Sequence, residues 1–224
     1  MKPKSRMLIL ICIALVLGLV SFPAHNAQAQ PLMDVSVVFR SGAIQDGWVL
    51  ESTETSNTGG SMDSTSATFR LGDSASNQQY RAILHFNTAS IPDTATITSV
   101  KLKIKRQGAA VGVDPFTTHG KLILDIRTPF FGTANSLALG DFRAAATKNN
   151  GGQFSSIPVS GGKAYIATLP ATSFGFINLT GTTQFRLRFS LDDDNDNVAD
   201  YWNLYSGNFG VVTDRPELEI QYVP

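Results

Sequence analysis

The sequence is poor in the residues that favour helices and in those that form disulfides. Its 224 residues include only four glutamates and a single cysteine, Cys12. Cys12 lies in an N-terminal apolar segment that we expect to be removed, so the mature chain would contain no disulfide and no thiol nucleophile. No segment has the apolar period of an amphipathic helix, and only 141–147 leans towards helix. These absences favour an all-β exported protein, of a kind typical of bacteria.

The recognised catalytic motifs are also missing. The sequence contains no G-x-S-x-G nucleophile elbow, no H-E-x-x-H zinc pair and no phosphate-binding glycine loop. Two histidines, His85 and His119, follow the N-terminal segment, and His85 falls among the outward residues of a predicted strand. We therefore expect His85 at the surface, and we predict no catalytic activity from these motifs.

The N-terminus has the features of a secretory signal. Three basic residues within the first six precede an apolar run from Met7 to Phe22, and an Ala-x-Ala sequence ends at Ala29. The apolar run is shorter than the roughly 20 residues that span a membrane. The sequence thus predicts that residues 1–29 are cleaved, and that residues 30–224 are secreted or placed on the cell surface without a membrane anchor.

The predicted mature chain is slightly acidic. It has 15 basic and 18 acidic residues, a net charge of −3, which gives no reason to expect a nucleic-acid partner. No internal repeat or hinge-like linker divides it, so we expect one domain.

Alternating apolar and polar residues indicate short strands through most of the mature chain. The clearest alternation is in 79–86, 96–106, 183–191 and 217–223, and weaker signals occur in 33–39, 45–51, 67–71, 122–127, 163–169 and 201–205. Residues 52–66 and 149–162 lack periodicity and predict loops. This pattern predicts a jelly-roll-like antiparallel β-sandwich.

An acidic segment between two of these strands is the strongest candidate for a metal site. Calcium prefers six to eight oxygen ligands. We expect these to come from Asp192, Asp194, Asp196, Asn197 and Asp200. The first three carboxylates have the spacing of an EF-hand loop, but Asn197 replaces its glycine and Asn203 replaces its final glutamate, so this is not an EF-hand. The alternative is a loop of turn-forming residues that is simply solvated.

A second set of residues is a candidate for binding a glycan. The aromatic members are Trp202, Tyr201 and Tyr205, and the cationic members are Lys101, Lys103, Lys105, Arg186 and Arg188. If their strands are neighbours, the cations would form a strip suited to carboxylate or sulfate groups. Alternatively, these charges solvate an exposed sheet and the aromatics are packed inside it. Trp48 is expected in the core.

Several motifs resemble the core of DNRLRE-type modules. They are Arg81-x-x-Leu84-x-Phe86-x-Thr88, Ile91-Pro92-x-x-Ala95-x-Ile97, Leu102-x-Ile104 and Arg215-Pro216-x-Leu218-x-Ile220-x-Tyr222. The resemblance extends from about Val35 to the end of the chain. Such modules are similar to carbohydrate-binding jelly rolls of bacterial exported proteins, some of which bind acidic polysaccharides such as alginate. The matching positions are mainly core and turn residues, so the resemblance assigns no binding residue.

Together these observations predict an exported, non-catalytic module that binds extracellular or cell-wall polysaccharide, with calcium as its only expected cofactor. Two alternatives stay open. One is a structural or adhesive cell-surface protein without glycan specificity. The other is a polysaccharide lyase, because lyases can be built on jelly rolls from tyrosine, histidine and arginine.

Overall fold

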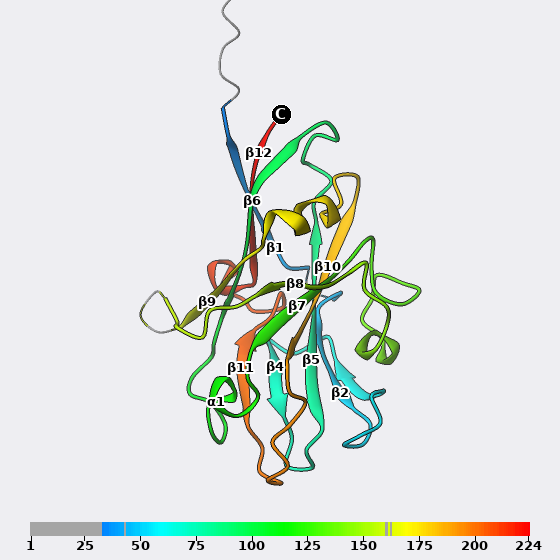
Figure 1. Cartoon of the computed structure of the whole chain (residues 1–224), viewed down its shortest axis with the longest axis vertical. Helices are drawn as coiled ribbons and strands as arrows, with labels where there is room; N and C mark the ends of the chain where they lie inside the picture. Colours follow the sequence, from blue (N-terminus) through cyan, green and yellow to red (C-terminus); the bar gives the residue numbers. More distant parts are fainter. Residues whose placement is uncertain (1–32, 43, 160, 162) are drawn as a thin grey trace, which may run out of the picture. The chain divides into compact units, whose positions relative to one another are not determined.

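The computed structural model describes residues 33–42, 44–159, 161 and 163–224. Two antiparallel sheets make up this part of the chain (Figure 1). The smaller sheet has the order β1 (Val35–Arg40), β12 (Glu217–Val223), β6 (Thr96–Lys105), β9 (Ala164–Thr168). The larger has the order β11 (Tyr201–Tyr205), β4 (Thr68–Asp73), β5 (Gln79–Asn87), β10 (Thr182–Phe189), β7 (Leu122–Arg127), β8 (Lys148–Gln153), and in it β2 (Gly47–Glu51) also pairs with β5 and with β3 (Gly59–Asp63).

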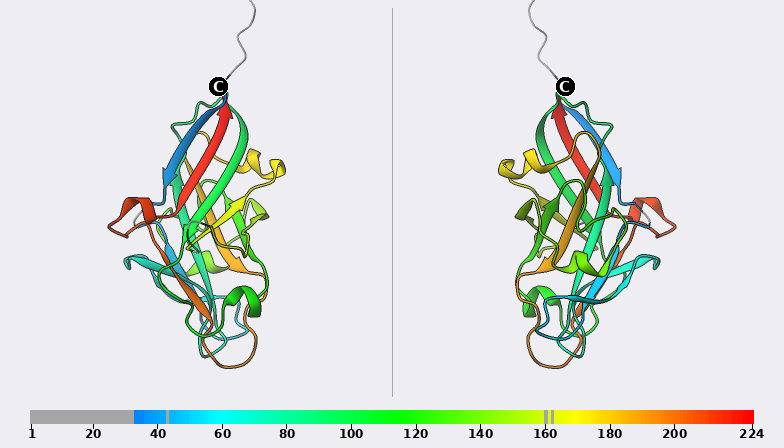
Figure 2. Two further views of the ribbon diagram at one scale, coloured as in Figure 1. Left: turned by 90° about the vertical axis from the view of Figure 1, so that its left-hand side faces the viewer. Right: turned by 90° about the vertical axis from the view of Figure 1, so that its right-hand side faces the viewer.

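The chain passes repeatedly from one sheet to the other. Thus β1 and β2 belong to different sheets, as do β5 and β6, β9 and β10, and β11 and β12. Figure 2 shows β1, β12 and β6 side by side on one side of the domain. The predicted jelly-roll-like antiparallel sandwich is therefore confirmed.

In the part of the chain that the structure describes, helical structure is limited to four short segments. They are α1 (Pro115–Thr118) and the 3-10 turns η1 (Leu139–Phe142), η2 (Ala171–Phe176) and η3 (Val212–Asp214). The predicted helical leaning of 141–147 is realised only in η1, and the chain leaves helical geometry after Phe142. Within the described residues, no helix has the length and apolar character needed to cross a membrane.

The main core lies between the two sheets. Alternation directs Val100, Leu102 and Ile104 of β6 inwards, where they are fully buried against strands of the other sheet. Burying one aliphatic side chain of this size contributes about 1.5–3 kcal/mol. The face that β6 presents to the core is thus the one that its sequence pattern predicts.

A second, smaller core covers part of the outer face of the larger sheet. The segment between β7 and β8 folds back over this face, and its Phe131, Leu137 and Phe142 pack against Val49 and Ile83. As a result β10 is buried on both faces over much of its length. His85, expected at the surface, is only 8% exposed, because its ring lies against Gly42 and the Gln184 amide.

Two strands occur where the sequence predicts loops. These are β3, within 52–66, and β8, at the start of 149–162. Both are rich in glycine or small polar residues, and backbone hydrogen bonding to β2 and to β7 aligns them. The predicted secretory signal, residues 1–29, lies outside the described residues.

Candidate functional site

The acidic loop between β10 and β11 brings three of the predicted metal-binding residues together. One carboxylate oxygen from each of Asp194, Asp196 and Asp200 lies within 4.8 Å of the other two. The loop lies at the same end of the domain as the turn from β4 to β5 (Figure 1). A hydrogen bond joins them: the backbone N–H of Asn197 donates to the side-chain Oδ1 of Asn77 at 3.0 Å.

A fourth carboxylate, that of Asp73, meets this loop from β4. Its Oδ1 accepts the backbone N–H of Asp200 at 2.9 Å, and its own N–H donates to the carbonyl of Asp200 at 3.0 Å. Asp73 and Asp200 are both fully buried. The sequence analysis missed Asp73 because Gly72-Asp73 has the pattern of a strand terminus and lies far from the acidic loop in the sequence.

Three carboxylate oxygens in this region are buried and have no hydrogen-bond partner among the residues that the structure describes. They are Oδ2 of Asp73, Oδ2 of Asp200 and Oδ1 of Asp194. The other oxygen of Asp200 accepts the N–H of Val113 at 2.7 Å. Buried carboxylate oxygens are ordinarily satisfied by a donor or a cation, so these three call for a physical explanation.

Two glycines allow the backbone to close around Asp200. Gly72 has a φ of +127°, and a Cβ added there would lie 2.0 Å from the carbonyl oxygen of Asp200. Gly112 has a φ of +68°, and its added Cβ would lie 2.0 Å from Oδ1 of Asp200. A side chain at either position would displace Asp200, so both glycines are needed for this arrangement.

The carboxylates of the acidic loop repel one another, and the pKa values of two of them are raised. Burial raises the pKa of Asp194, and the charges of Asp196, Asp200 and Asp73 raise that pKa further. Burial and the charge of Asp192 likewise raise the pKa of Asp193. Both shifts mean that the loop binds protons more readily than isolated aspartates do, as expected when like charges are held together.

The remaining predicted ligands have other environments. Asn197 has a φ of +58° and forms a turn, a role in which asparagine is common. Asp192 is exposed and is not one of the three clustered carboxylates. His119 is fully buried nearby, with its Nε2 3.2 Å from Oδ1 of Asp73. The structure thus groups three of the five predicted residues, and Asp73 is hydrogen-bonded to the backbone of one of them.

An aromatic cluster surrounds Arg70 of β4, with rings from β2, β5 and β11. The guanidinium carbon of Arg70 lies 5.4 Å from the ring centre of Trp48, 5.5 Å from that of Tyr80 and 5.0 Å from that of Tyr201. Nη1 of Arg70 donates to the Tyr80 hydroxyl at 3.1 Å. Tyr80 is buried, whereas Arg70, Trp48 and Tyr201 are partly exposed. We call Arg70, Trp48, Tyr80 and Tyr201 the Arg70 cluster.

Strand alternation separates the three predicted aromatic ligands. Trp202 is 4% exposed and packs in the main core, where its Nε1 donates to Oδ1 of Asp114 at 3.0 Å. Tyr201 and Tyr205 lie on the opposite face of β11, and Tyr205 stacks on Phe209 with 4.2 Å between ring centres. Trp202 is therefore part of the core, and Tyr201 and Tyr205 are the accessible pair.

The five predicted cations do not form one strip. Lys101, Lys103 and Lys105 lie on β6, in the smaller sheet, whereas Arg186 and Arg188 lie on β10 in the larger one. Oppositely charged neighbours accompany two of the lysines: Lys105 lies 2.8 Å from Asp214, and Lys103 lies 3.8 Å from Glu217. These contacts fit the alternative in which the β6 lysines solvate an exposed sheet.

The two arginines of β10 form ion pairs with a buried carboxylate. Nη2 of Arg186 lies 2.8 Å from Oδ2 of Asp125, and Nε of Arg188 lies 3.2 Å from the same oxygen. Arg186 is 5% exposed, and its Nη1 donates to three backbone carbonyls of the covering segment. Arg186 therefore fastens the cover to the sheet and is not accessible to a ligand.

The surface pockets in the described part of the chain include three with volumes of about 160 to about 460 Å³. One of about 160 Å³ is lined by Lys105, Lys163, Ala164, Tyr205 and Asp214. It contains the predicted residues Lys105 and Tyr205, but Lys105 forms an ion pair with Asp214 there.

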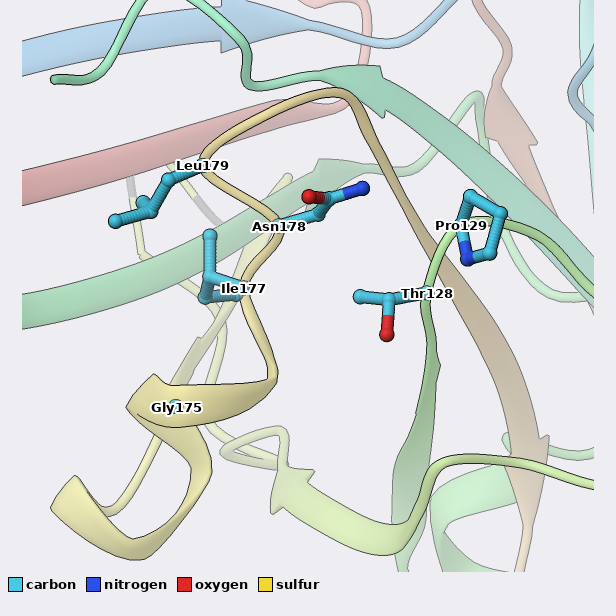
Figure 3. Close-up of a pocket in the computed structure, with 6 residues that line it drawn as sticks. All are labelled: Thr128, Pro129, Gly175, Ile177, Asn178 and Leu179. Carbon is cyan, nitrogen blue, oxygen red and sulfur yellow. The ribbon is translucent and has the colours of Figure 1, made fainter. Parts of the chain in front are cut away.

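The other two pockets adjoin each other near η2. The first, about 300 Å³, lies between residues 175–179 and the pair Thr128 and Pro129 (Figure 3). Its amide side chain, Asn178, already bonds the turn at Thr180 and Thr182. The second, about 460 Å³, is mainly apolar. Neither contains a charged side chain, so the Arg70 cluster and the acidic loop are the better candidates.

Comparison of the chain with models of known protein families and with curated proteins gives no match.

Proposed function

We propose that the chain is an exported, non-catalytic module that binds extracellular or cell-wall polysaccharide through the Arg70 cluster. The observation that supports this proposal best is the placement of one arginine among three aromatic rings, two of which, Trp48 and Tyr201, are partly exposed. The resemblance to DNRLRE-type modules is consistent with it.

The chemistry of the cluster suits a sugar ring. An aromatic face packs well against the C–H groups of a pyranose, while tyrosine and tryptophan can also hydrogen-bond to hydroxyl groups. Trp48 and Tyr80 are held edge to face, with 5.2 Å between their centres, so the side chains need little rearrangement on binding. Less conformational entropy is lost when the binding surface is already ordered.

Arg70 favours an acidic glycan over a neutral one. A guanidinium has five N–H donors in a planar fork, which matches a carboxylate bidentately. The bond from Arg70 to the Tyr80 hydroxyl uses one of them. The aromatic contacts fix the plane of the fork, so we expect uronate-containing polymers such as alginate to bind better than neutral glucans.

Affinity electrophoresis on a panel of acidic and neutral polysaccharides tests this proposal. We expect Trp48→Ala and Tyr201→Ala each to weaken binding at least about tenfold, equivalent to about 1.4 kcal/mol. Tyr205→Ala is the matched control, since Tyr205 lies on the same face of β11 but stacks on Phe209. It should bind like the wild type.

Three results would contradict the proposal. Retention of no polysaccharide at all would favour the structural or adhesive alternative. Loss of binding in Tyr205→Ala alone would place the site at the Lys105 pocket. Release of unsaturated sugar ends from any polymer would show that the protein is a lyase.

A further inference from the structure

We propose that Asp194, Asp196 and Asp200, in the loop that precedes β11, bind one calcium ion, and that Asp73 at the end of β4 holds Asp200 in place beside it. Calcium binding here would not require the glycan-binding function proposed above. The three ligands each have a carboxylate oxygen within 4.8 Å of the other two.

The unpartnered oxygens distinguish this cluster from an ordinary solvated acidic loop. Asp200 is fully buried, and its Oδ2 has no hydrogen-bond partner in the described residues. A solvated loop would leave its carboxylate oxygens open to water, whereas Oδ2 of Asp200 is shielded and unpaired. A cation at the cluster would satisfy this oxygen and neutralise the repulsion.

Asp73 supplies an independent observation from a different part of the chain. It is also fully buried, with one oxygen used by the Asp200 N–H and the other unpartnered. Two segments more than a hundred residues apart in sequence therefore place buried carboxylates next to each other, joined by the Asp200 N–H.

The donor atoms favour calcium over other divalent ions. The proposed ligands are all carboxylate oxygens, the donors preferred by hard cations, and the loop can supply carbonyl oxygens and water to complete six to eight ligands. Magnesium requires a near-ideal octahedron and retains most of its water, which a carboxylate-rich flexible loop does not favour. Zinc would prefer a nitrogen ligand. The imidazole of His119 lies nearby, but it faces the Asp73 oxygen that already accepts the Asp200 N–H and is not one of the clustered groups.

Thermal unfolding of the purified chain after treatment with chelator tests the proposal. Calcium at about 100 times its dissociation constant should raise the melting temperature by about 5–10 °C, because the ion binds the folded state selectively. Calorimetric titration should show one ion per chain. Sodium chloride at equal ionic strength should not reproduce the shift.

Variants distinguish a built site from diffuse negative charge. Asp194→Asn combined with Asp196→Asn should abolish the calcium shift, and this exposed loop should tolerate both changes. Asp192→Asn combined with Asp193→Asn is the matched control: it removes the same charge from the same loop, but outside the clustered carboxylates, and should retain most of the shift. Asp73→Asn preserves an oxygen for the Asp200 N–H, so Asp200 should stay in place and calcium should still bind.

Each opposite outcome would overturn the assignment. The proposal fails if calcium leaves the wild-type melting temperature unchanged, or if sodium chloride gives the same shift. Equal loss in the two double variants would show nonspecific screening. A larger shift with magnesium or zinc than with calcium would show that a different ion is bound.

Discussion

Nη2 of Arg186 lies 2.8 Å from Oδ2 of Asp125, and both side chains are buried beneath the segment that covers the larger sheet. The same oxygen of Asp125 faces Arg188, and its other oxygen accepts the N–H of Asn150 at 3.0 Å. One carboxylate thus joins β7, β8 and β10. This relationship leads to the first prediction.

Asp125→Asn should destabilise the protein by about 3–5 kcal/mol, because it leaves the charge of Arg186 buried without its partner. Urea unfolding at neutral pH would measure the change. Asp93→Asn is the control: Asp93 is exposed, and its replacement should alter stability by no more than about 0.5 kcal/mol. A loss below about 1 kcal/mol in Asp125→Asn would contradict this account of the buried pair.

The contribution of Asp125 should also depend on pH. Burial alone would raise the pKa of Asp125, but the Asn150 N–H and the two arginines lower it below its usual value. A carboxylate with a depressed folded pKa contributes stability above its unfolded pKa of about 3.9 and loses it as the pH falls through the folded value. The stability difference between wild type and Asp125→Asn should therefore narrow below about pH 4.

Asp46 should give the opposite pH dependence. Burial raises the pKa of Asp46 to about 7, although hydrogen bonds from Ser41 and Gly207 and the charge of Arg215 oppose the rise. A raised folded pKa contributes stability that is complete below the unfolded value of 3.8 and is lost as the pH rises through about 7. A shift of about three pKa units limits this loss to about 4 kcal/mol.

Asp46→Asn should remove most of that loss, because asparagine can still accept from Ser41 and Gly207 but does not ionise. Stability would be measured by urea unfolding at several pH values from about 4 to about 8. Equal pH dependence in the variant and the wild type would show that Asp46 does not cause it. Asp93→Asn again serves as the control for removal of an exposed charge.

Gly72→Ala should destabilise the protein and weaken the proposed calcium site together. The substitution requires a φ of +127° from alanine and places its Cβ 2.0 Å from the Asp200 carbonyl oxygen. We expect a loss of at least about 2 kcal/mol in chemical unfolding. Gly210→Ala, where an added Cβ has no neighbour within 4 Å, should be nearly neutral. A neutral Gly72→Ala would mean that β4 and β11 can separate without cost.

Arg70 should determine the salt dependence of glycan binding. Exposed charges are screened over about 10 Å at 0.1 M salt, so wild-type affinity for a polyuronate should fall as sodium chloride increases from about 0.05 M to about 0.5 M. Arg70→Gln should bind weakly with little salt dependence. Arg70→Lys should keep the salt dependence but lose affinity, since lysine has no planar fork. Salt-independent wild-type binding would contradict the role of Arg70.

The sequence predicts the strands that have one buried face. In β6 and β12 the apolar residues alternate with charged ones, and the structure reproduces the predicted faces, including Val100, Leu102 and Ile104 inside. For β3 and β8 the side chains contain almost no signal, because pairing of the backbone with β2 and β7 positions them. Periodicity cannot reveal a strand of this kind.

The candidate sites were predictable only where their residues are close in sequence. Asp194, Asp196 and Asp200 belong to one loop, so their grouping could be anticipated. Asp73 and Arg70 join their sites through the pairing of β4 with β11, a contact across more than a hundred residues. The burial of Arg186 depends on a cover that comes from another segment. The pairing of β4 with β11 and the cover over Arg186 both belong to the tertiary structure, which no local sequence pattern encodes.

The cover over the larger sheet also affects which substitutions the protein can accept. In β6 and β12 buried positions alternate with accessible ones, so every second residue has room to vary. In β10 five consecutive residues, Thr183 to Leu187, are buried, because one face meets the main core and the other meets the cover. A saturation-mutagenesis profile of β10 should therefore lack the two-residue rhythm of β6. Although the sequence of β10 alternates clearly, its polar positions should be among the least tolerant of substitution.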